Sequence, residues 1–332
     1  MPMPALPARY ANGNAVKRIA SENKWCLPRR RHSSKRRIRI AAMPNSSSNA
    51  ALSRPSAAPP KRLIVCADDY ALSAPTSAAI LELARPGRIT ATSAMVLSPL
   101  WPRAAAEARD VAPYIDMGLH LDWTSEFAIA GGHGRSLPIL MLATSLRRLR
   151  PHDAEAVIER QLDAFERHMQ AMPDHVDGHQ HVHQFPQIRD ALIKVLERRY
   201  AGKRKPWLRI ARPPAQLAQL KPRVIALMGA DTLQHLCDAA GFAHSNHLIG
   251  IYDFTGGERR YLALLDGWLR AAAEGDVLMC HPGHGEDAGA ELAAARGWEQ
   301  KTLDSESFPQ LLQRAGIVLQ RGSRLFTGTI TP

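Results

Sequence analysis

Seven short runs of apolar and β-branched residues constrain the fold of this chain most strongly. Most are separated by stretches with helical periodicity, which is the rhythm of βα units around a parallel sheet. The pattern predicts an α/β fold, built as a barrel or as a large open sheet. The predicted strands are residues 62–67, 89–97, 114–121, 174–178, 207–211, 247–251 and 276–280.

Helical periodicity is clearest over residues 153–171. Ile158, Leu162, Phe165 and Met169 recur there at spacings of four, three and four, and Asp153 is placed to cap the helix start. We therefore expect the apolar face of this helix to lie in the core. Further helices are predicted at 75–86, 102–111, 186–200, 231–241, 258–273 and 306–315, with loops at 131–135 and at Pro206.

The positive charge of the chain is concentrated in its first sixty residues. The 332 residues carry a formal net charge of +12, and residues 1–60, with twelve basic side chains and one acidic one, account for +11 of it. This segment joins a basic stretch to a Ser/Pro/Ala-rich stretch, so we predict a disordered tail at 1–60 and one domain over 61–332. The nearly neutral domain argues against nucleic-acid binding outside the tail, and a translation start at Met43 would remove most of the charge.

Two absences in the sequence bear on where the protein works. No run approaches the ~18 apolar residues that cross a bilayer, and no apolar signal-peptide stretch follows the basic N-terminus. The four cysteines, which are too few for a disulfide scaffold, favour reduced thiols and a cytoplasmic setting. They are Cys26, Cys66, Cys237 and Cys280.

Side chains able to bind a metal or move protons follow four of the predicted strands. The carboxyl ends of parallel strands meet at one edge of a sheet, so these groups are predicted to form one site. Asp68 and Asp69 end the first strand, and as adjacent carboxylates they point to different sides of the chain. One could bind a cation while the other accepts a proton, although two acids before a helix could also cap it.

Four histidines, the strongest single signal, occur between residues 175 and 183. Neutral imidazole is a common metal ligand, and in an extended segment His179, His181 and His183 would face one way, unless a turn at Gly178 intervenes. We expect one or two of them to bind a metal and the others to orient these ligands or contact substrate. The alternative is a surface histidine cluster without a ligand.

The remaining candidates follow other strands. His120 and His281 stand at strand ends like the groups above, although a lone strand histidine is often a hydrogen-bonded core residue. Arg212 could orient an anionic or carbonyl group, whereas Arg209 lies inside its strand and is expected to pack. Trp123 could stack on a sugar face or pack in the core. The chain has no nucleophile elbow, Gly-rich phosphate loop or CxxC pair, which weakens serine-hydrolase, nucleotide-binding and zinc-finger interpretations.

Four blocks in this order, LIVCADDYALS, GLHLDWT, VDGHQHVHQFP and CHPG, resemble the YdjC-like carbohydrate deacetylases. That family includes chitooligosaccharide deacetylases and deacetylases associated with hopanoid biosynthesis. The resemblance covers about residues 61–325 and implies a distorted seven-stranded (β/α) barrel, similar to a TIM barrel. The first block usually contains ADDFG in the family, whereas this chain has ADDYA. Loss of the glycine leaves both aspartates in place but is expected to reshape the loop beside them, which would affect the substrate range more than catalysis.

The resemblance implies a role for each residue that matches a family motif. Asp69, His120 and His179 would hold one divalent ion, Mg²⁺ or Zn²⁺. Asp68 would act as the general base, and His281 would supply the acid side of the reaction. His181, His183, Arg212 and Trp123 are our candidates for substrate binding or for support of these groups.

These groups fit a hydrolase that removes acetyl groups from N-acetylated sugars through attack of a metal-activated water on the acetamide. The sugar would be a chitooligosaccharide or part of a glycolipid, and the segment 125–151 is expected to shape that choice. The alternatives are a metal-dependent phosphoesterase on the same barrel and a non-catalytic sugar-binding protein. The expected partner is a carbohydrate substrate, with a homodimer left open.

Overall fold

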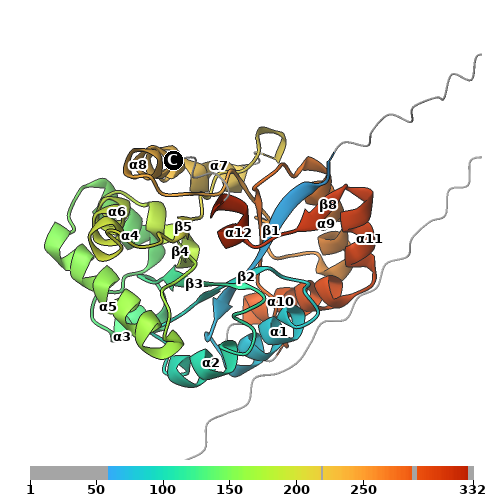
Figure 1. Ribbon diagram of the computed structural model, residues 1–332, viewed down its shortest axis with the longest axis horizontal. Helices are drawn as coiled ribbons and strands as arrows, with labels where there is room; N and C mark the ends of the chain where they lie inside the picture. The colour runs from blue at the N-terminus through green and yellow to red at the C-terminus, as the bar shows by residue number, and fades with distance from the viewer. Residues whose placement is uncertain (1–58, 218–219, 286–289, 328–332) are drawn as a thin grey trace, which may run out of the picture. The chain divides into compact units, whose positions relative to one another are not determined.

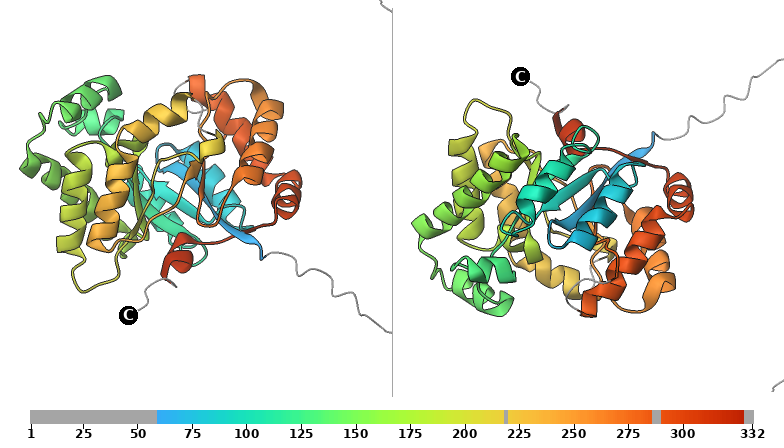
Figure 2. Two further views of the ribbon diagram at one scale, coloured as in Figure 1. Left: turned by 90° about the horizontal axis from the view of Figure 1, so that it is seen from above. Right: turned by 90° about the horizontal axis from the view of Figure 1, so that it is seen from below.

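The computed structural model describes residues 59–217, 220–285 and 290–327. The tail predicted at 1–60 lies outside these residues except for its last two positions. The described chain forms a curled parallel sheet with helices around its outer side (Figures 1 and 2). The strands are β1 (Lys61–Tyr70), β2 (Ala91–Ala94), β3 (Asp116–Leu121), β4 (His175–Gly178), β5 (Trp207–Leu208), β6 (Leu248–Ile249), β7 (Val277–Cys280) and β8 (Ile317–Leu319).

The sheet is the distorted barrel that the sequence predicts. Its strands follow the order β5-β4-β3-β2-β1-β7-β6, with β8 paired to the start of β1. The two end strands do not form a regular ladder with each other. They are linked instead by a bridge between Leu208 and His244 and by a hydrogen bond from the Leu248 N–H to the Arg212 carbonyl at 2.8 Å. All seven predicted strands are present, and β8 is an addition to them.

β1 is an interior strand of the sheet, and its residues from Leu63 to Tyr70 are all buried. It pairs in parallel with β2 through Cys66 and Ala91 and with β7 through Val65 and Leu278. Such two-sided burial is typical of strands in parallel sheets. The register with β2 shifts between Ala67 and Tyr70, so the chain is irregular where the two adjacent aspartates lie.

The predicted helices are all present within a few residues of their expected bounds. Ile158, Leu162, Phe165 and Met169 are buried as expected. The predicted cap is wrong, because the helix begins at Pro151 after Arg150, and Asp153 lies in its first turn; proline is preorganised for the first helical position. These helices are α1 (Ala74–Ala84), α2 (Trp101–Ala108), α5 (Pro151–Met169), α6 (Ile188–Arg199), α8 (Ala230–Ala240), α9 (Gly257–Ala271) and α11 (Ser307–Arg314).

Several elements were not expected from the sequence, and two of them lie in the segment 125–151. The sequence LPILMLATS of α4 is apolar at most positions, so it lacks the polar face by which a surface helix is identified. The additional elements are α3 (Glu126–Ala130), α4 (Leu137–Ser145), η1 (His179–Gln184), η2 (Ala215–Leu217), α7 (Leu220–Leu227), α10 (Ala290–Asp304) and α12 (Gly322–Thr327).

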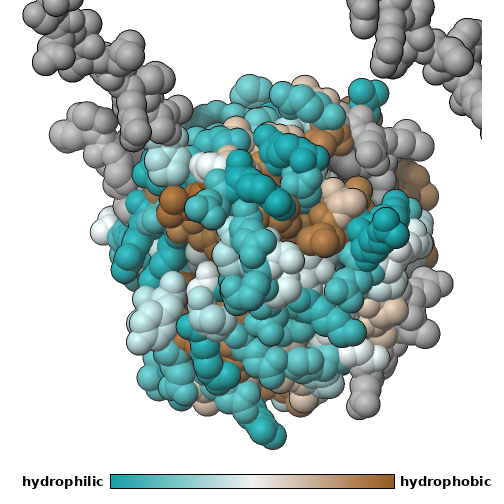
Figure 3. All heavy atoms as spheres, turned by 90° about the vertical axis from the view of Figure 1, so that its right-hand side faces the viewer, coloured by the Kyte–Doolittle hydropathy of each residue, from teal (hydrophilic) through white to brown (hydrophobic). Residues whose placement is uncertain are grey.

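The core lies between the sheet and the helices around it. Trp101 of α2 stacks on Phe165 of α5 with ring centroids 5.6 Å apart, which fixes these two helices against each other. The side that carries α9 and α11 is largely hydrophilic, with hydrophobic residues gathered in its upper half (Figure 3). No helix among the described residues is both long and apolar enough to span a membrane.

Candidate active site

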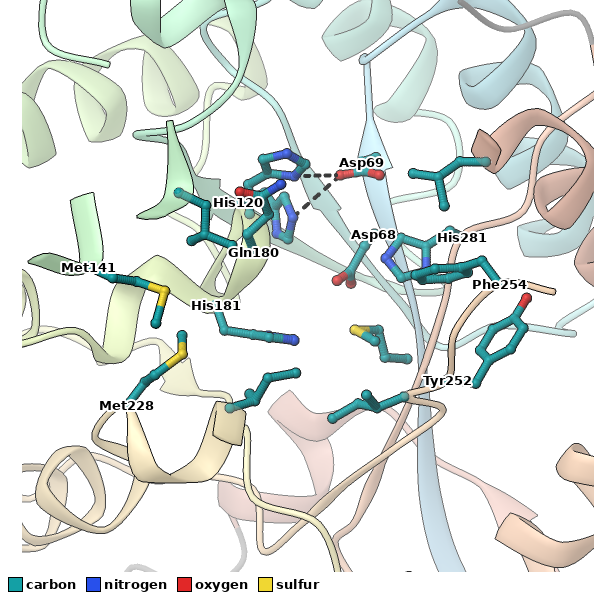
Figure 4. Close-up of a pocket in the computed structure, with 16 residues that line it drawn as sticks. Asp68, Asp69, His120, Met141, Gln180, His181, Met228, Tyr252, Phe254 and His281 are labelled. Atoms are coloured by element: carbon teal, nitrogen blue, oxygen red, sulfur yellow. Dashed lines mark hydrogen bonds and ion pairs between the residues drawn. The ribbon is translucent and has the colours of Figure 1, made fainter. Parts of the chain in front are cut away.

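One cavity of about 570 Å³ collects most of the residues predicted from the strand ends. Six of them line it from β1, β3, the segment after β4 and the end of β7 (Figure 4). The prediction that these strand ends form one site is therefore consistent with the structure. The six residues are Asp68, Asp69, His120, His179, His181 and His281.

Asp69 is positioned by an unusual backbone. Its φ of 71° lies in the left-handed region, which non-glycine residues seldom adopt, and it falls within the register shift of β1. Its Oδ1 lies 3.2 Å from Nδ1 of His179 and 3.5 Å from Nε2 of His120 (Figure 4). One donor atom from each of the three residues thus falls within 4.8 Å of the others.

The donor set of Asp69, His120 and His179 fits a divalent metal ion. Nδ1 of His120 donates to the Asp177 carboxylate at 2.6 Å, which orients Nε2 toward Asp69. A carboxylate behind an imidazole ligand is the usual support in metal sites. Burial alone would lower the pKa of His120, but the carboxylates of Asp177 and Asp68 raise it to about 10. The negative charge that retains a proton on this ring would equally favour a metal cation.

Two other groups of potential ligands are less suited to a metal. They combine Cys66, His175 and Asp177, or Asp68, His120 and Asp177. The buried Arg209 guanidinium already lies beside the carboxylates that these groups require, 2.6 Å from Asp68 and 3.1 Å from Asp177. Arg209 contacts both oxygens of Asp68, and His120 and Arg209 contact one oxygen each of Asp177. Asp69 differs, because its arginine partner contacts Oδ2 and leaves Oδ1 toward the two histidines. The group that contains Asp69 is therefore the better candidate for a metal.

Asp68 lines the cavity and is held from behind. Its two oxygens accept hydrogen bonds from Nη1 and Nη2 of Arg209 at 2.6 and 2.8 Å, and the Ser93 hydroxyl approaches Oδ1 at 3.3 Å. Arg209 is fully buried, as expected for a residue that packs, and it also forms an ion pair with Asp68 that the sequence did not indicate. The β5 ladder ends at Leu208, and the next side chain turns inward, where the guanidinium fixes the orientation of Asp68.

The histidine run does not adopt the extended conformation considered from the sequence. Gly178 ends β4, and Gln180 and His181 have φ of 53° and 61°, so the chain turns through η1 and the three imidazoles diverge. His179 faces Asp69, and His181 lines the cavity. His183 is buried beneath it and donates from Nε2 to the Arg209 carbonyl at 2.8 Å. Among these histidines, only His179 and His181 can meet a substrate.

Arg212 and Trp123 are not brought into the cavity. Arg212 forms an ion pair with Asp231 at 2.7 Å near the protein surface. The Trp123 side chain is 2% exposed, and its ring meets that of His133 edge-on at 6.0 Å. Of the two roles considered for Trp123, stacking on a sugar or packing in the core, the structure therefore shows packing. Neither Trp123 nor Arg212 lies where it would contact a substrate in this cavity.

His281 faces Asp68 and Asp69 across the cavity (Figure 4). Burial lowers its pKa to about 4, so its imidazole is neutral near pH 7. The ring meets Phe254 edge-on at 5.3 Å, and its buried Nδ1 has no hydrogen-bond partner among the described residues. The backbone N–H of His281 donates to Oε2 of Glu299 at 2.6 Å, which fixes this side of the site.

α10 contributes two ionisable groups, Arg296 and Glu299, that were not identified from the sequence. Nη2 of Arg296 lies 2.6 Å from Oδ2 of Asp69. Burial opposes ionisation of Asp69, but Arg296 and the two histidines hold its pKa well below the usual range. Glu299 accepts a hydrogen bond from the Tyr252 hydroxyl at 2.7 Å, and burial raises the pKa of its carboxyl to about 7. α10 thus contacts Asp69 through Arg296 and the backbone of His281 through Glu299.

Much of the cavity wall is apolar. Met141 of α4 and Met228, which follows α7, face each other on one side, and Phe254 lies on the other (Figure 4). No arginine or lysine is among the described residues that line it. The cavity therefore combines a polar floor of carboxylates and imidazoles with walls that favour uncharged groups.

Comparison with known proteins identifies relatives over most of the barrel. A chitooligosaccharide deacetylase of Citrobacter koseri is 29% identical over 238 residues, which cover 66% of this chain and 81% of the relative. A chitooligosaccharide deacetylase of Salmonella paratyphi B is 27% identical with the same coverage. The structure of a candidate cellobiose-phosphate cleavage protein from Enterococcus faecalis shares the fold, with a TM-score of 0.60 and 20% identity over 80% of this chain and 99% of that one. The family model for YdjC-like proteins matches residues 62–314. This chain therefore belongs to the YdjC-like protein family.

Proposed function

We propose that this protein is a metal-dependent carbohydrate N-deacetylase, which hydrolyses the acetamide of an N-acetylated sugar. The observation that carries the proposal is the placement of Asp68, His281 and the donor group of Asp69, His120 and His179 around one cavity. The names of the curated relatives support a chitooligosaccharide as the substrate. The apolar wall formed in part by Met141 and Met228 supports a glycolipid-type substrate as the alternative.

A divalent cation at the Asp69 group would polarise the acetamide carbonyl and increase the acidity of a water molecule. Two imidazoles and one carboxylate suit Zn²⁺ in particular, and Mg²⁺ is the ion to compare with it. One carboxylate and two imidazoles also leave coordination positions free, which is typical of catalytic metal sites.

Amide hydrolysis requires a proton acceptor for the attacking water and a proton donor for the leaving amine. Asp68 is the acceptor that we propose, because its carboxylate lines the cavity and Arg209 fixes its orientation. His281 is the proposed donor. Since its imidazole is neutral near pH 7 in the substrate-free protein, it has to gain the proton during the reaction, as negative charge develops beside it.

The structure gives little support to the two alternative functions. A phosphoesterase would need cationic side chains for a phosphate, and the described lining residues include none. A purely sugar-binding protein would not need a carboxylate oriented by a buried arginine beside a candidate metal group. Release of acetate from an acetylated oligosaccharide would exclude the sugar-binding function.

The decisive variant is Asp68→Asn, which removes the proposed base and leaves the Asp69 group intact. We expect acetate release to fall by roughly 10²- to 10⁴-fold while the metal content is unchanged. Asp163→Asn, at an exposed carboxylate of α5 paired with Arg199, serves as the control and should retain full activity. Because Asp68→Asn unpairs Arg209, circular dichroism must show that the variant is folded. Unchanged turnover would remove Asp68 from the mechanism.

The metal is tested by chelation and by a ligand variant. Treatment with a chelator should abolish acetate release, and addition of Zn²⁺ or Mg²⁺ should identify the ion that restores it. His179→Ala should lower the metal content measured by elemental analysis, since this ligand is only partly buried and its loss should not unfold the protein. Full activity after metal removal would contradict the proposal.

We further propose that the reaction takes place in the cytoplasm. The three cysteines of the described chain, Cys66, Cys237 and Cys280, are buried and free, which suits a reducing compartment. A homodimer remains a prediction, and light scattering of the purified protein would test it.

A further inference from the structure

Large hydrophobic side chains are exposed around the cavity. Nine such side chains are exposed in the described part of the chain, and five of them belong to α4, α7, α10 or the residue that directly follows α4. The same helices and their flanking residues line the cavity. The five are Ile139, Leu142, Leu146, Leu227 and Leu292, exposed by 56%, 61%, 52%, 85% and 37%.

α4 is apolar on both of its sides. Leu140 is fully buried and Met141 faces the cavity, whereas Ile139 and Leu142 point away from the core. Met141 of α4 and Met228, which follows α7, line the same side of the cavity (Figure 4), so the two helices flank one mouth. A helix that is hydrophobic all round is normally covered, so the outer side of α4 calls for a partner that residues 59–217, 220–285 and 290–327 do not supply.

Basic residues accompany these apolar helices. The segments 131–150 and 212–230 contain seven arginines and lysines and no acidic residue. Arg148, Arg150 and Arg223 are exposed. Arg147 and Arg212 have acidic neighbours outside the two segments, at Asp190 and Asp231. The two segments around α4 and α7 therefore combine exposed apolar side chains with an excess of positive charge, whereas the start of α10 beside Leu292 contains an acidic residue, Glu291.

This combination discriminates between the partners that could cover it. A second copy in a symmetric contact would bring like charges together, which is unfavourable. The N-terminal segment of the same chain carries +11 and would also be repelled. A nucleic acid would match the charge but offers no apolar layer for the leucines. An anionic lipid surface offers both acyl chains and negative head groups.

We propose that the outer side of α4 and the adjacent end of α7 dock on an anionic lipid surface, with Leu142 and Leu227 inserted and the arginines at the head groups. Docking would hold the cavity mouth against the lipid. The proposal does not depend on the deacetylase reaction, because it concerns binding alone.

The test is co-sedimentation of the full chain with vesicles of phosphatidylcholine and phosphatidylglycerol, compared with phosphatidylcholine alone. The basic N-terminal segment could also bind these vesicles, so binding is measured at two salt concentrations. Near 0.15 M the mixed vesicles should bind more protein than phosphatidylcholine alone, and near 1 M a Debye length of only about 3 Å suppresses electrostatic attraction and leaves apolar insertion. The variant is Leu142→Ser with Leu227→Ser. The control is Tyr114→Ser, at a side chain 72% exposed that lies at the opposite, amino end of β3.

We expect wild type and Tyr114→Ser to bind the mixed vesicles in high salt, and the double variant to show a roughly tenfold lower bound-to-free ratio. Acetate release from a water-soluble oligosaccharide should be equal in all three proteins, which separates this proposal from that of the enzymatic function. Equal vesicle binding by the double variant and wild type would overturn the proposal. So would light scattering that shows a wild-type dimer converted to a monomer by the double substitution, because a second copy would then be the partner.

Discussion

The carboxyl of Glu299 makes the stability of the protein depend on pH. Burial raises its pKa to about 7 from an ordinary value of 4.5, so the folded state binds this proton more tightly than the unfolded state. The resulting stabilisation is fully present below pH 4.5 and is lost as pH rises to 7. Over this window Glu299 should lower the free energy of unfolding by about 3 kcal/mol at most.

Glu299→Gln keeps a neutral group that can still accept from the His281 N–H and bond to the Tyr252 oxygen. Urea unfolding between pH 4.5 and 7 should therefore show a smaller loss of stability in this variant than in wild type. Glu306→Gln, at a side chain 88% exposed, should follow wild type. A Glu299→Gln protein with the full wild-type pH dependence would show that this carboxyl is not the cause.

Sequence alone was sufficient for residues whose position follows from a strand end. Asp68, Asp69, His120 and His281 were found because parallel strands bring their carboxyl ends together. The cationic partners were not found, because the ion pair of Arg209 joins residues 141 positions apart and that of Arg296 spans 227 positions. No local spacing marks such pairs, so only the folded chain reveals what orients each aspartate.

At the level of single elements, the glycine of β3 makes room for an aromatic ring from β4. A Cβ added to Gly118 would lie 2.2 Å from the ring of His175, which is itself stacked on Trp207 with centroids 4.5 Å apart. Gly118→Ala must displace this ring, and we expect a loss of about 1–3 kcal/mol in the free energy of unfolding. Gly267→Ala in α9, where no atom lies within 4 Å of the added Cβ, should instead gain up to ~1 kcal/mol. Urea unfolding measures both, and equal stability of the two variants would contradict this packing argument.

Helices and strands were predictable where residue composition and hydrophobic periodicity indicate the same type of element. The seven strands and α5 meet that condition, whereas α4 is apolar on both sides and β8 has only three residues. The turn in the histidine run was left open for another reason: Gln180 and His181 have a left-handed φ, which neither residue type favours.

For the whole molecule, the number of strands was predictable but the way in which the barrel ends meet was not. β5 and β6 have only two residues each, and a single bridge joins Leu208 of β5 to His244, which precedes β6. Such contacts depend on backbone geometry and have no sequence signature. The resemblance of the four motifs to the YdjC-like family implied a distorted barrel, whereas periodicity alone left open a barrel or an open sheet.

We propose that the domain from residue 61 onward carries the whole activity. The family match begins at residue 62, and the residues that we place in the site all lie beyond it. A variant that starts at Met43 should release acetate at the wild-type rate and unfold at the same urea concentration, because it retains every contact described for the barrel. It should elute earlier from a cation-exchange column, since most of the +11 charge precedes Met43. Loss of turnover in this variant, with unfolding unchanged, would show instead that the basic segment contributes to catalysis.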